Sequence, residues 1–596
     1  MEDMVHGIKV DYSRDKLFDE LGLKRLKESY MKEDEKSPQE RFAYVSKTFG
    51  SNQEHSQRLY EYSSKHWLSY STPILAFGRT KYGLPISCFL PYLHDSASGL
   101  VDTLSEVNWL SMLGGGVGIG MGIRSADDKS VGIMPHLKTY DASCLAYRQG
   151  KTRRGSYAAY LDISHPDILL FLDMRKPTGD QNMRALNLHH GINITDDFMK
   201  LVEESMRDPH ADDSWYLRDP HTGDVKETVS AREVWQRILE NRMLTGEPYI
   251  HFIDTSNKAM PQFQKDKGLK IRQSNLCSEI ILPTDRHRTA VCCLSSVNLE
   301  YFDEWKKDKL FLKDIAEMLD NVLQYFIDNA PVTIKRAKYS AIQERSIGVG
   351  ALGYHAYLQK NGYAFEGPLA ISANVRMFKH IRQNLDKANM ELGTERGEAP
   401  DAKGTGRRFS HVMAIAPNAS SSIIMGNTSP SIEPWRANAY RQDTLSGSYL
   451  NKNKYLDKLL REKVSDEDKL QEIWSSIIAN DGSVQHLEVL DDSEKELYKT
   501  AMEIDQRWVI EHAAHRQEYI DQSQSLNLFF RPDSNIKYIH ACHFLAWKQG
   551  LKTLYYCRSE KLAKADKVSK RIERNIIKEI DMSAIASGND CLACEG

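Results

Sequence analysis

The segment RQSNLCSEIILPT (residues 272–284) places an amide, a thiol and a carboxylate at alternate positions. Successive side chains of an extended chain point to opposite sides, so Asn275, Cys277 and Glu279 would share one face if this segment is a strand. Three chemically useful groups would then converge on one small volume. The alternative is an edge strand whose polar face meets solvent. From these residues alone, both interpretations stay open.

Composition narrows the class of protein. The chain has 596 residues, 41% of them hydrophobic and 27% charged, with a formal net charge of −3. A general nucleic-acid-binding protein would be strongly basic. The amino terminus is charged from its second residue, unlike a signal peptide, and the apolar stretch MLGGGVGIGMGI (residues 112–123) is too short and too glycine-rich to span a bilayer. We therefore expect a cytoplasmic protein that binds neither nucleic acid nor membrane.

The cysteines are too sparse for a disulfide scaffold, so most are expected to be small buried residues. The nine are Cys88, Cys144, Cys277, Cys292, Cys293, Cys542, Cys557, Cys591 and Cys594. The last two form a CxxC pair at the end of the chain. A zinc site would require a second CxxC or a pair of histidines at metal-ligand spacing, so we predict no metal site.

The pattern of apolar residues predicts a helical region over residues 1–70, an α/β domain over residues 71–560, and a carboxy-terminal segment over residues 561–596. Predicted strands cover residues 85–93, 157–163, 274–282, 290–297 and 524–530, and predicted helices cover residues 231–246, 312–330 and 466–479. A charged surface helix is predicted over residues 560–580 and a flexible tail over residues 581–596.

Two glycine-containing stretches resemble phosphate-binding motifs but fail on spacing. Gly150-Lys151-Thr152 lacks the glycine that a P-loop requires at position 145, which is leucine. The stretch LGGGVGIGMG (residues 113–122) has no glycines in the G-x-G-x-x-G arrangement. Its glycines still permit a ligand or a packed strand to approach the backbone closely.

Several motifs together resemble the large (catalytic) subunit of ribonucleotide reductase. RQSNLCSEI resembles the family's active-site segment, and the other matching motifs follow in the family's order. These are STPILAFG (71–78), ISCFLPYLHDS (86–96), the block from Gly150 to Lys176, AVCCLSSVNL (290–299), APNASSSIIMGNTSPSIEP (416–434) and WKQGLKTLYY (547–556). The resemblance implies a ten-stranded α/β barrel with a central finger loop that carries a radical cysteine, preceded by a short helical region.

The resemblance also implies a reaction, the reduction of ribonucleoside diphosphates to 2′-deoxyribonucleotides by thiyl-radical chemistry. Cys277 would become the thiyl radical that abstracts the 3′-hydrogen, and Glu279 would accept the proton of the 3′-hydroxyl. Asn275 would orient the ribose hydroxyls. Cys88 would protonate the departing 2′-oxygen, and Cys88 with Cys292 would supply two electrons and close into a disulfide.

The neighbouring Cys293 creates an ambiguity in the redox pair. On a strand, Cys292 and Cys293 face opposite sides, so only one of them can meet Cys88. The family pattern A-x-C-x-L-S favours Cys292. For substrate binding, the resemblance points to a phosphate site at the start of a helix, where small polar residues precede an apolar run; simple helix capping is the alternative. The substrate-binding candidates are Thr72, Ser87, Asn418, Ala419, Ser420 and Ser421.

Tyr555 and Tyr556 match the tyrosine pair that relays the radical from a separate metal-containing small subunit in class I enzymes. Adjacent residues of a regular strand face opposite sides, so their cooperation does not follow from spacing. The resemblance implies that this chain binds no cofactor of its own and depends on that radical-generating partner. An adenosylcobalamin-dependent reductase on the same barrel, and a catalytically silent nucleotide-binding regulator, are the alternatives.

The resemblance also implies how activity is regulated by nucleotides and how the disulfide is reduced again after each turnover. Asp95, Arg124 and Arg154 match positions that contact a nucleoside triphosphate effector at the family's specificity site, which lies at a homodimer interface. Only 87 residues precede Cys88, so the family's amino-terminal ATP-cone is expected to be absent, with weak or no inhibition by dATP. Cys591 and Cys594 would carry electrons from thioredoxin or glutaredoxin to the buried disulfide.

Overall fold

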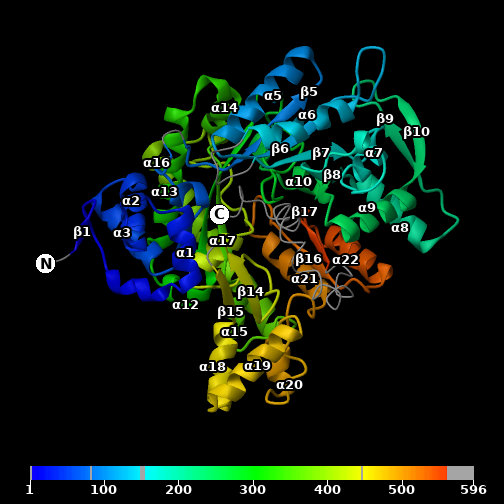
Figure 1. Cartoon of the computed structure of the whole chain (residues 1–596). Coiled ribbons are helices and arrows are strands. Elements are labelled where there is room, and N and C mark those ends of the chain that lie inside the picture. The colour runs from blue at the N-terminus through cyan, green and yellow to red at the C-terminus, as the bar shows by residue number, and fades with distance from the viewer. Residues whose placement is uncertain (1–2, 81–82, 148–154, 445–446, 560–596) are drawn as a thin grey trace.

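The computed structural model describes residues 3–80, 83–147, 155–444 and 447–559 (Figure 1). Its strands are β1 Met4–Val5, β2 Ile8–Lys9, β3 Leu68–Tyr70, β4 Cys88–Leu90, β5 Tyr92–His94, β6 Gly116–Gly122, β7 Tyr157–Asp162, β8 His189–Ile194, β9 Ser214–Arg218, β10 Val225–Ser230, β11 Tyr249–Phe252, β12 Ala290–Asn298, β13 Ile347–Leu352, β14 Ala439–Thr444, β15 Gly447–Lys452, β16 Leu528–Phe530, β17 Thr553–Leu554 and β18 Cys557–Ser559.

The α-helices are α1 Glu20–Ser29, α2 Pro38–Phe49, α3 Gln53–Ser64, α4 Thr72–Leu75, α5 Ala97–Met112, α6 Ile133–Ala146, α7 Ile168–Asp173, α8 Asp196–Arg207, α9 Ala231–Thr245, α10 Ile253–Ala259, α11 Gln262–Lys265, α12 Phe302–Trp305, α13 Phe311–Asn329, α14 Lys335–Glu344, α15 Tyr354–Lys360, α16 Pro368–Arg396, α17 Ala419–Ile424, α18 Lys454–Lys463, α19 Glu467–Ala479, α20 Asp492–Leu497, α21 Gln506–Gln517 and α22 Ile536–Lys548. The three long helices predicted from periodicity are confirmed as α9, α13 and α19, each within one residue of the expected bounds at both ends.

The amino-terminal region folds as helices because each of its main helices begins at a residue that caps it. The side chains of Asp19, Ser37 and Asn52 accept hydrogen bonds from backbone amides in the first turns of α1, α2 and α3. These helices lie against one flank of the molecule, where α2 and α3 contact α13 (Figure 1).

Ten strands form one mixed sheet, which confirms the predicted α/β barrel class. Its main path is β13-β12-β4-β6-β7-β8-β11-β17, with β3 paired to β12 and β5 paired to β6. The strands from β4 to β11 run parallel along this path, as expected when helices connect them. The register of β12 on β4 is antiparallel and sets Cys292 opposite Cys88.

Two segments without regular strands lie between β13 and β17, the two ends of the sheet path. Residues 412–416 lie beside β13, through a parallel bridge between Val349 and Met413, and residues 522–528 lie beside them, through a bridge between Ile415 and Gln524. The amide of Tyr555 then donates to the Leu526 carbonyl at 2.9 Å. Of the predicted strand over residues 524–530, only Leu528–Phe530 is regular.

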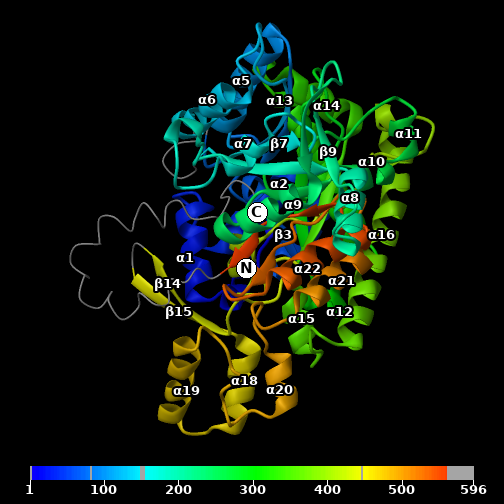
Figure 2. The ribbon, with the colours of Figure 1, turned by 90° about the vertical axis from the view of Figure 1, so that its right-hand side faces the viewer.

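The interior of the curled sheet has its own buried cluster, separate from the main core between sheet and helices. It contains Cys88, Leu90, Ala158, Tyr160, Tyr249, Leu276, Cys277, Ile280, Leu282, Ala290, Cys292, Leu294, Ala414, Ala416, Tyr555 and Tyr556. A third cluster supports a lobe of α18, α19 and α20, which projects from one end of the molecule in both ribbon views (Figure 2). No helix in the described ranges has both the length and the apolar character required to cross a bilayer.

Candidate active site

Residues 272–282 form a loop inside the curled sheet. The predicted strand over residues 274–282 is wrong: the chain makes a turn there, and Ser278 has a φ of 67° in the left-handed region. A residue other than glycine in this region is held by its surroundings. The expectation of a central finger loop, which came from the family resemblance, agrees with this conformation.

Glycines of β6 let the loop approach the sheet. A Cβ atom on Gly118 would lie 2.4 Å from the Ser274 carbonyl oxygen and 2.7 Å from the Asn275 Cα. A Cβ on Gly120 would lie 2.7 Å from the side-chain oxygen of Gln273. The glycine-rich stretch therefore serves close backbone approach, with the loop as its neighbour.

Hydrogen bonds to the loop backbone fix its turn. The Tyr160 hydroxyl donates to the Asn275 carbonyl at 2.7 Å, and the Thr553 hydroxyl donates to the Ser278 carbonyl at 2.6 Å. The amide of Ser523 donates to the Glu279 carbonyl at 2.9 Å. Because these partners come from β7, from β17 and from the segment 522–528, the barrel wall holds the loop from several sides.

The three polar residues of the loop each have a contact inside the curled sheet, although strand alternation does not set their orientation. The Tyr555 hydroxyl lies 3.4 Å from the Cys277 sulfur. The Asn275 amide lies 3.8 Å from the Cys88 sulfur. The Ser525 hydroxyl lies 2.5 Å from the Cys277 carbonyl and 3.1 Å from Glu279 Oε2, so it links the thiol residue to the carboxylate.

The side chains of Cys292 and Cys293 face opposite sides of β12. Cys292 lies in the inner cluster with Cys88, whereas the Cys293 sulfur lies 3.5 Å from the Leu319 carbonyl of α13. Burial, assisted by the neighbouring Cys88 and Glu279, raises the pKa of the Cys292 thiol well above its ordinary value. Cys292 is therefore a protonated thiol in the resting protein.

The adjacent tyrosines form a compact aromatic group. The ring centroids of Tyr555 and Tyr556 are 4.3 Å apart, and the Tyr249 ring lies 4.8 Å from the first and 5.1 Å from the second. Strand β17 ends at Leu554, so the alternation of a regular strand does not govern the pair. A continuous contact path thus runs from Tyr556 through Tyr555 to Cys277.

The substrate-binding candidates gather around the start of α17. Ser420 and Ser421 are buried, Ala419 is exposed, and the Ser420 hydroxyl accepts a hydrogen bond from Arg25 of α1 at 3.0 Å. The Asn418 side chain makes no cap; its amide donates to Ser296 and to the Ala351 carbonyl, each at 3.0 Å. The cap position of α17 is Asn418, so Ser420, Ser421 and Ser422 lie within the helix, where the Ser422 hydroxyl donates to the Ala419 carbonyl at 2.8 Å.

The other two substrate-binding candidates have different neighbours. The Ser87 hydroxyl is 3.7 Å from the Cys88 sulfur, and the Thr72 hydroxyl is 3.3 Å from the Tyr30 hydroxyl. Among the effector candidates, Asp95 accepts from the Arg124 backbone amide and guanidinium at 3.1 and 3.0 Å. Arg154, Cys591 and Cys594 lie outside the described residues.

Several residues that contact the site carry no sequence signal. They are Tyr160, Ser523, Ser525 and Thr553 around the loop, and Tyr249, His189 and Glu247 around the tyrosine pair. Tyr160 and Thr553 lie within the matching motifs without a role assigned to them there, and the other five lie outside any motif. Only the fold brings these residues to the site.

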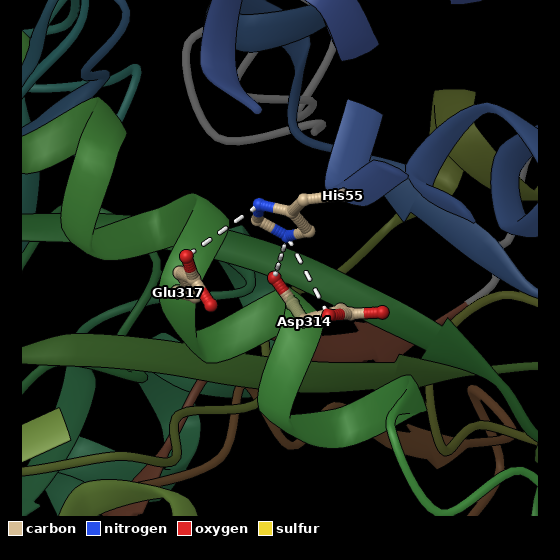
Figure 3. Close-up of side chains that lie close together, drawn as sticks. All are labelled: His55, Asp314 and Glu317. Atoms are coloured by element: carbon tan, nitrogen blue, oxygen red, sulfur yellow. Dashed lines mark hydrogen bonds and ion pairs between the residues drawn. The ribbon is translucent and has the colours of Figure 1, made fainter. Parts of the chain in front are cut away.

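A group of His55, Asp314 and Glu317 joins α3 to α13 and has the residue types of a metal site (Figure 3). Its carboxylates already carry cationic partners. Arg58 forms two hydrogen bonds with Asp314, at 2.7 and 2.9 Å, and Arg396 donates to Glu317 at 2.8 Å. The group therefore acts as an ionic clamp between the amino-terminal helices and the barrel.

Comparison with family models matches both parts of the fold. The model described as "Ribonucleotide reductase, all-alpha domain" matches residues 16–83. The model described as "Ribonucleotide reductase, barrel domain" matches residues 86–405 and 400–557. Together these matches cover well over half of the chain.

Similar proteins agree with the family models. The ribonucleoside-diphosphate reductase large subunit of Invertebrate iridescent virus 3 is 55% identical, over 99% of this chain and 100% of the relative. The corresponding large subunit of Caenorhabditis elegans is 32% identical, over 98% of this chain and 82% of the relative. The solved structure of the Actinobacillus ureae class Id ribonucleotide reductase alpha subunit superposes with a TM-score of 0.81 at 34% identity, over 92% of this chain and 98% of that chain.

Proposed function

The chain belongs to the ribonucleotide reductase large-subunit family, a family of oxidoreductases that reduce ribonucleoside diphosphates, and on that premise we propose that Cys277 is its radical residue. The observation that carries the proposal is the 3.4 Å contact between the Tyr555 hydroxyl and the Cys277 sulfur. A phenol and a thiol in direct contact can exchange a hydrogen atom. A thiyl radical at Cys277 would then abstract the 3′-hydrogen of the substrate ribose.

Glu279 is proposed as the base that takes the proton of the 3′-hydroxyl. A general base must lie within hydrogen-bond reach of the proton that it accepts. The same loop carries Glu279 and Cys277, and Ser525 contacts both residues, so the carboxylate keeps a fixed position relative to the sulfur. Asn275, whose amide lies near the Cys88 sulfur, is proposed to orient the ribose hydroxyls.

Cys88 and Cys292 are proposed as the two-electron reductant. Directly opposed residues of an antiparallel pair have Cα atoms about 4.5–5.5 Å apart, within the range that a disulfide spans. Cys88 would protonate the 2′-oxygen as it leaves as water. Cys292 would give the second proton, each sulfur would give one electron, and the two sulfurs would join. The raised pKa of Cys292 keeps its proton available for this step.

The substrate diphosphate is proposed to bind at the start of α17. Ser420 and Ser421, with the backbone around Asn418 and Ala419, offer hydroxyl and amide donors there. Arg25 reaches the Ser420 hydroxyl and adds a positive charge. The other two candidates, Thr72 and Ser87, would contact the substrate between this phosphate site and the reactive cysteines.

The tyrosine path requires an oxidant from another subunit, so we expect activity to depend on a radical-generating small subunit. The test measures deoxyribonucleoside diphosphate formation by the full-length chain with and without that subunit, in the presence of a dithiol reductant. Turnover is expected only when both subunits are present.

A parallel assay with adenosylcobalamin in place of the small subunit supplies the control. Turnover under that condition would identify a cobalamin-dependent reductase and contradict the relay. No turnover under any condition, with nucleotide binding intact, would favour the silent regulator instead.

Asp95 and Arg124 are proposed to contact a nucleoside triphosphate effector, together with Arg154. Apolar side chains are exposed on the neighbouring helices, including Val101 and Trp109 of α5 and Leu145 of α6. Exposed apolar side chains grouped on neighbouring elements are typical of protein–protein contact surfaces. These helices are therefore proposed as the contact between two copies of the chain, with the effector site beside it.

The cysteine pair at the end of the chain is proposed to re-reduce the buried disulfide. With Cys591→Ser and Cys594→Ser combined, pre-reduced enzyme is expected to complete one turnover per site and then stop when thioredoxin is the reductant. Exchange proceeds through a mixed disulfide, so an accessible thiolate is needed. Rapid-quench measurement of product per site checks this. Sustained thioredoxin-driven cycling by the double variant would contradict the shuttle.

A further inference from the structure

The active-site loop contacts two wall segments of the barrel that share few backbone hydrogen bonds with each other. Within the described ranges, no backbone hydrogen bond joins residues 520–525 to residues 552–554. The pairing of the two segments begins only where the Tyr555 amide donates to the Leu526 carbonyl at 2.9 Å. We call the junction of residues 520–525 with residues 552–554 the seam. Side chains and the loop itself must hold the seam together.

One lysine side chain crosses the seam. Lys552 directly precedes β17, and only 4% of its surface is exposed. Its Nζ donates hydrogen bonds to the backbone carbonyls of Ile520, Asp521 and Gln522, at 3.1, 3.2 and 2.7 Å. An ammonium group has three N–H donors, so each donor has one carbonyl as its acceptor. A single charged group thus ties three consecutive residues of one segment to the start of the other.

Few charged groups surround this buried ammonium. Burial lowers the pKa of Lys552 to about 8; the negative charge of Asp521 opposes this shift and the positive charge of Arg382 on α16 adds to it. Arg382 in turn donates to Asp386 at 2.8 Å. His251 of β11, the next strand, is uncharged because burial lowers its pKa to about 3. Lys552 is therefore charged at neutral pH, and its hydrogen bonds are charge-assisted.

The residues that follow this tie on both segments are residues that hold the active site. Thr553, next to Lys552, donates to the loop backbone at 2.6 Å, and the Ser523 amide donates to the loop backbone at 2.9 Å from the other side. Two residues after Thr553, the Tyr555 hydroxyl lies 3.4 Å from the Cys277 sulfur. The separation of the two segments therefore bears on the distance between the phenol and the thiol.

We propose that the ammonium of Lys552 is a positioning group, which closes the seam and thereby sets the approach of Tyr555 to Cys277. This inference rests on the roles proposed above for those two residues. Lys552 acts through the backbone of residues 520–522 and takes no part in the chemistry. Transfer of a hydrogen atom between a phenol and a thiol requires close contact, and a displacement of about 1 Å can cost about 10²-fold in rate.

The first test measures steady-state turnover of the holoenzyme with saturating small subunit. Lys552→Met keeps most of the side-chain length and removes all three donors. It is expected to lower kcat by about 10²-fold. The KM for substrate and the affinity for the small subunit are expected to stay unchanged, because the proposed phosphate site lies on other elements. An unchanged kcat would contradict the inference.

Gln517→Met is the matched control. The Gln517 side-chain amide, from α21, donates to the Ile520 and Gln522 carbonyls at 3.1 and 3.2 Å, two of the three that Lys552 holds. Its replacement removes hydrogen bonds from the same carbonyls and leaves the tie across the seam, so kcat is expected to stay close to that of the unmodified enzyme. A loss as large as that of Lys552→Met would show that the tie to β17 is not what matters.

The second test needs no variant and follows kcat of the unmodified enzyme as the pH is raised through about 8, the pKa of Lys552. A neutral amine has two N–H donors for three carbonyls, so kcat is expected to fall. Because the pKa of Lys552 in the fold lies below its ordinary value of 10.5, the unfolded chain binds more protons between these two values, and this group adds stability as the pH rises. Unfolding caused by this group therefore does not explain the fall, and thermal denaturation over the same range checks this.

Two outcomes of the pH series would overturn the role of the ammonium. One is a kcat that stays constant through this range in the unmodified enzyme. The other is the same fall in Lys552→Met, which would assign the titration to a different group. A fall in the unmodified enzyme that is absent from Lys552→Met supports the inference.

Comparison with Tyr555→Phe separates this inference from the relay on which it rests. If Tyr555→Phe is inactive and Lys552→Met keeps the kcat of the unmodified enzyme, the relay stands and the positioning role is wrong. If Tyr555→Phe is fully active, the relay itself fails, and the inference fails with it. Loss of kcat in both variants, with KM retained, supports both.

Discussion

Cys277→Ser is expected to lower kcat for ribonucleoside diphosphate reduction by about 10⁴-fold or more, the scale of losing the reacting atom of an enzyme. The serine O–H bond is much stronger than the thiol S–H bond, so a tyrosyl radical at Tyr555 cannot take its hydrogen. The substitution is nearly isosteric, and the loop contacts from Ser525 and Tyr160 involve backbone carbonyls, which serine retains. Substrate binding should therefore persist. Chromatographic measurement of deoxyribonucleotide formation, with parallel substrate binding, checks both expectations.

Cys293→Ser is the matched control for this variant. Cys293 is equally buried but faces α13 and lies outside the inner cluster. Its replacement is expected to leave kcat close to that of the unmodified enzyme. Comparable activity in the Cys277 and Cys293 variants would rule out Cys277 as the radical residue.

Tyr555→Phe is expected to lower kcat by about 10³-fold or more, with an unchanged KM. The substitution removes only the hydroxyl, and with it the 3.4 Å contact to the Cys277 sulfur. Phenylalanine has no O–H bond to break, so no neutral radical can form at this position, and the loss is at least of the size expected for removing a proton-transfer group. The affinity for the small subunit should be retained, and steady-state kinetics over a range of both ligands measures these quantities.

Tyr157→Phe tests whether the loss is specific. Tyr157 is a fully buried tyrosine of β7 that belongs to the main core rather than to the inner cluster. Its variant is expected to keep normal kcat. A Tyr555→Phe enzyme with substantial turnover would show that the radical reaches Cys277 by another path.

The sequence predicted the α/β class, the long helices and strand β12 well because these depend on local patterns; the ten-stranded barrel was implied by the family resemblance. The helical periodicity of residues 231–246 and 312–330 corresponds to α9 and α13, and the apolar run over residues 290–297 corresponds to β12. The opposite orientation of Cys292 and Cys293 also followed from strand geometry. These features need no knowledge of distant parts of the chain.

The loop at residues 272–282 could not be predicted from its own pattern. Its alternating polar residues suggested a strand, whereas the close approach to Gly118 and the bonds from Ser525 and Thr553 hold it in a turn. Those partners are far away in sequence, and Thr553 follows Ser278 by 275 residues. The sequence suggested that Asn275, Cys277 and Glu279 share one face of a strand, and the observed turn replaces that geometry.

The contacts around Tyr555 and Tyr556 were even harder to predict from the sequence than the loop. Strand alternation would separate Tyr555 from Tyr556, yet their rings touch because β17 ends just before them. His189 and Glu247 belong to no motif, and only the pairing of β8 with β11 brings their segments together. Contacts of this kind become visible only when the sheet order is known.

The antiparallel register of Cys88 and Cys292 has a consequence for the proposed disulfide between them. Backbone hydrogen bonds already fix the two strands at a separation that a disulfide can span, so bond formation needs no movement of the sheet. If the pair is the proposed reductant, the backbone frame of these two strands is the same before and after the disulfide closes. The proposed cysteine pair at the end of the same chain would then meet one frame in both states.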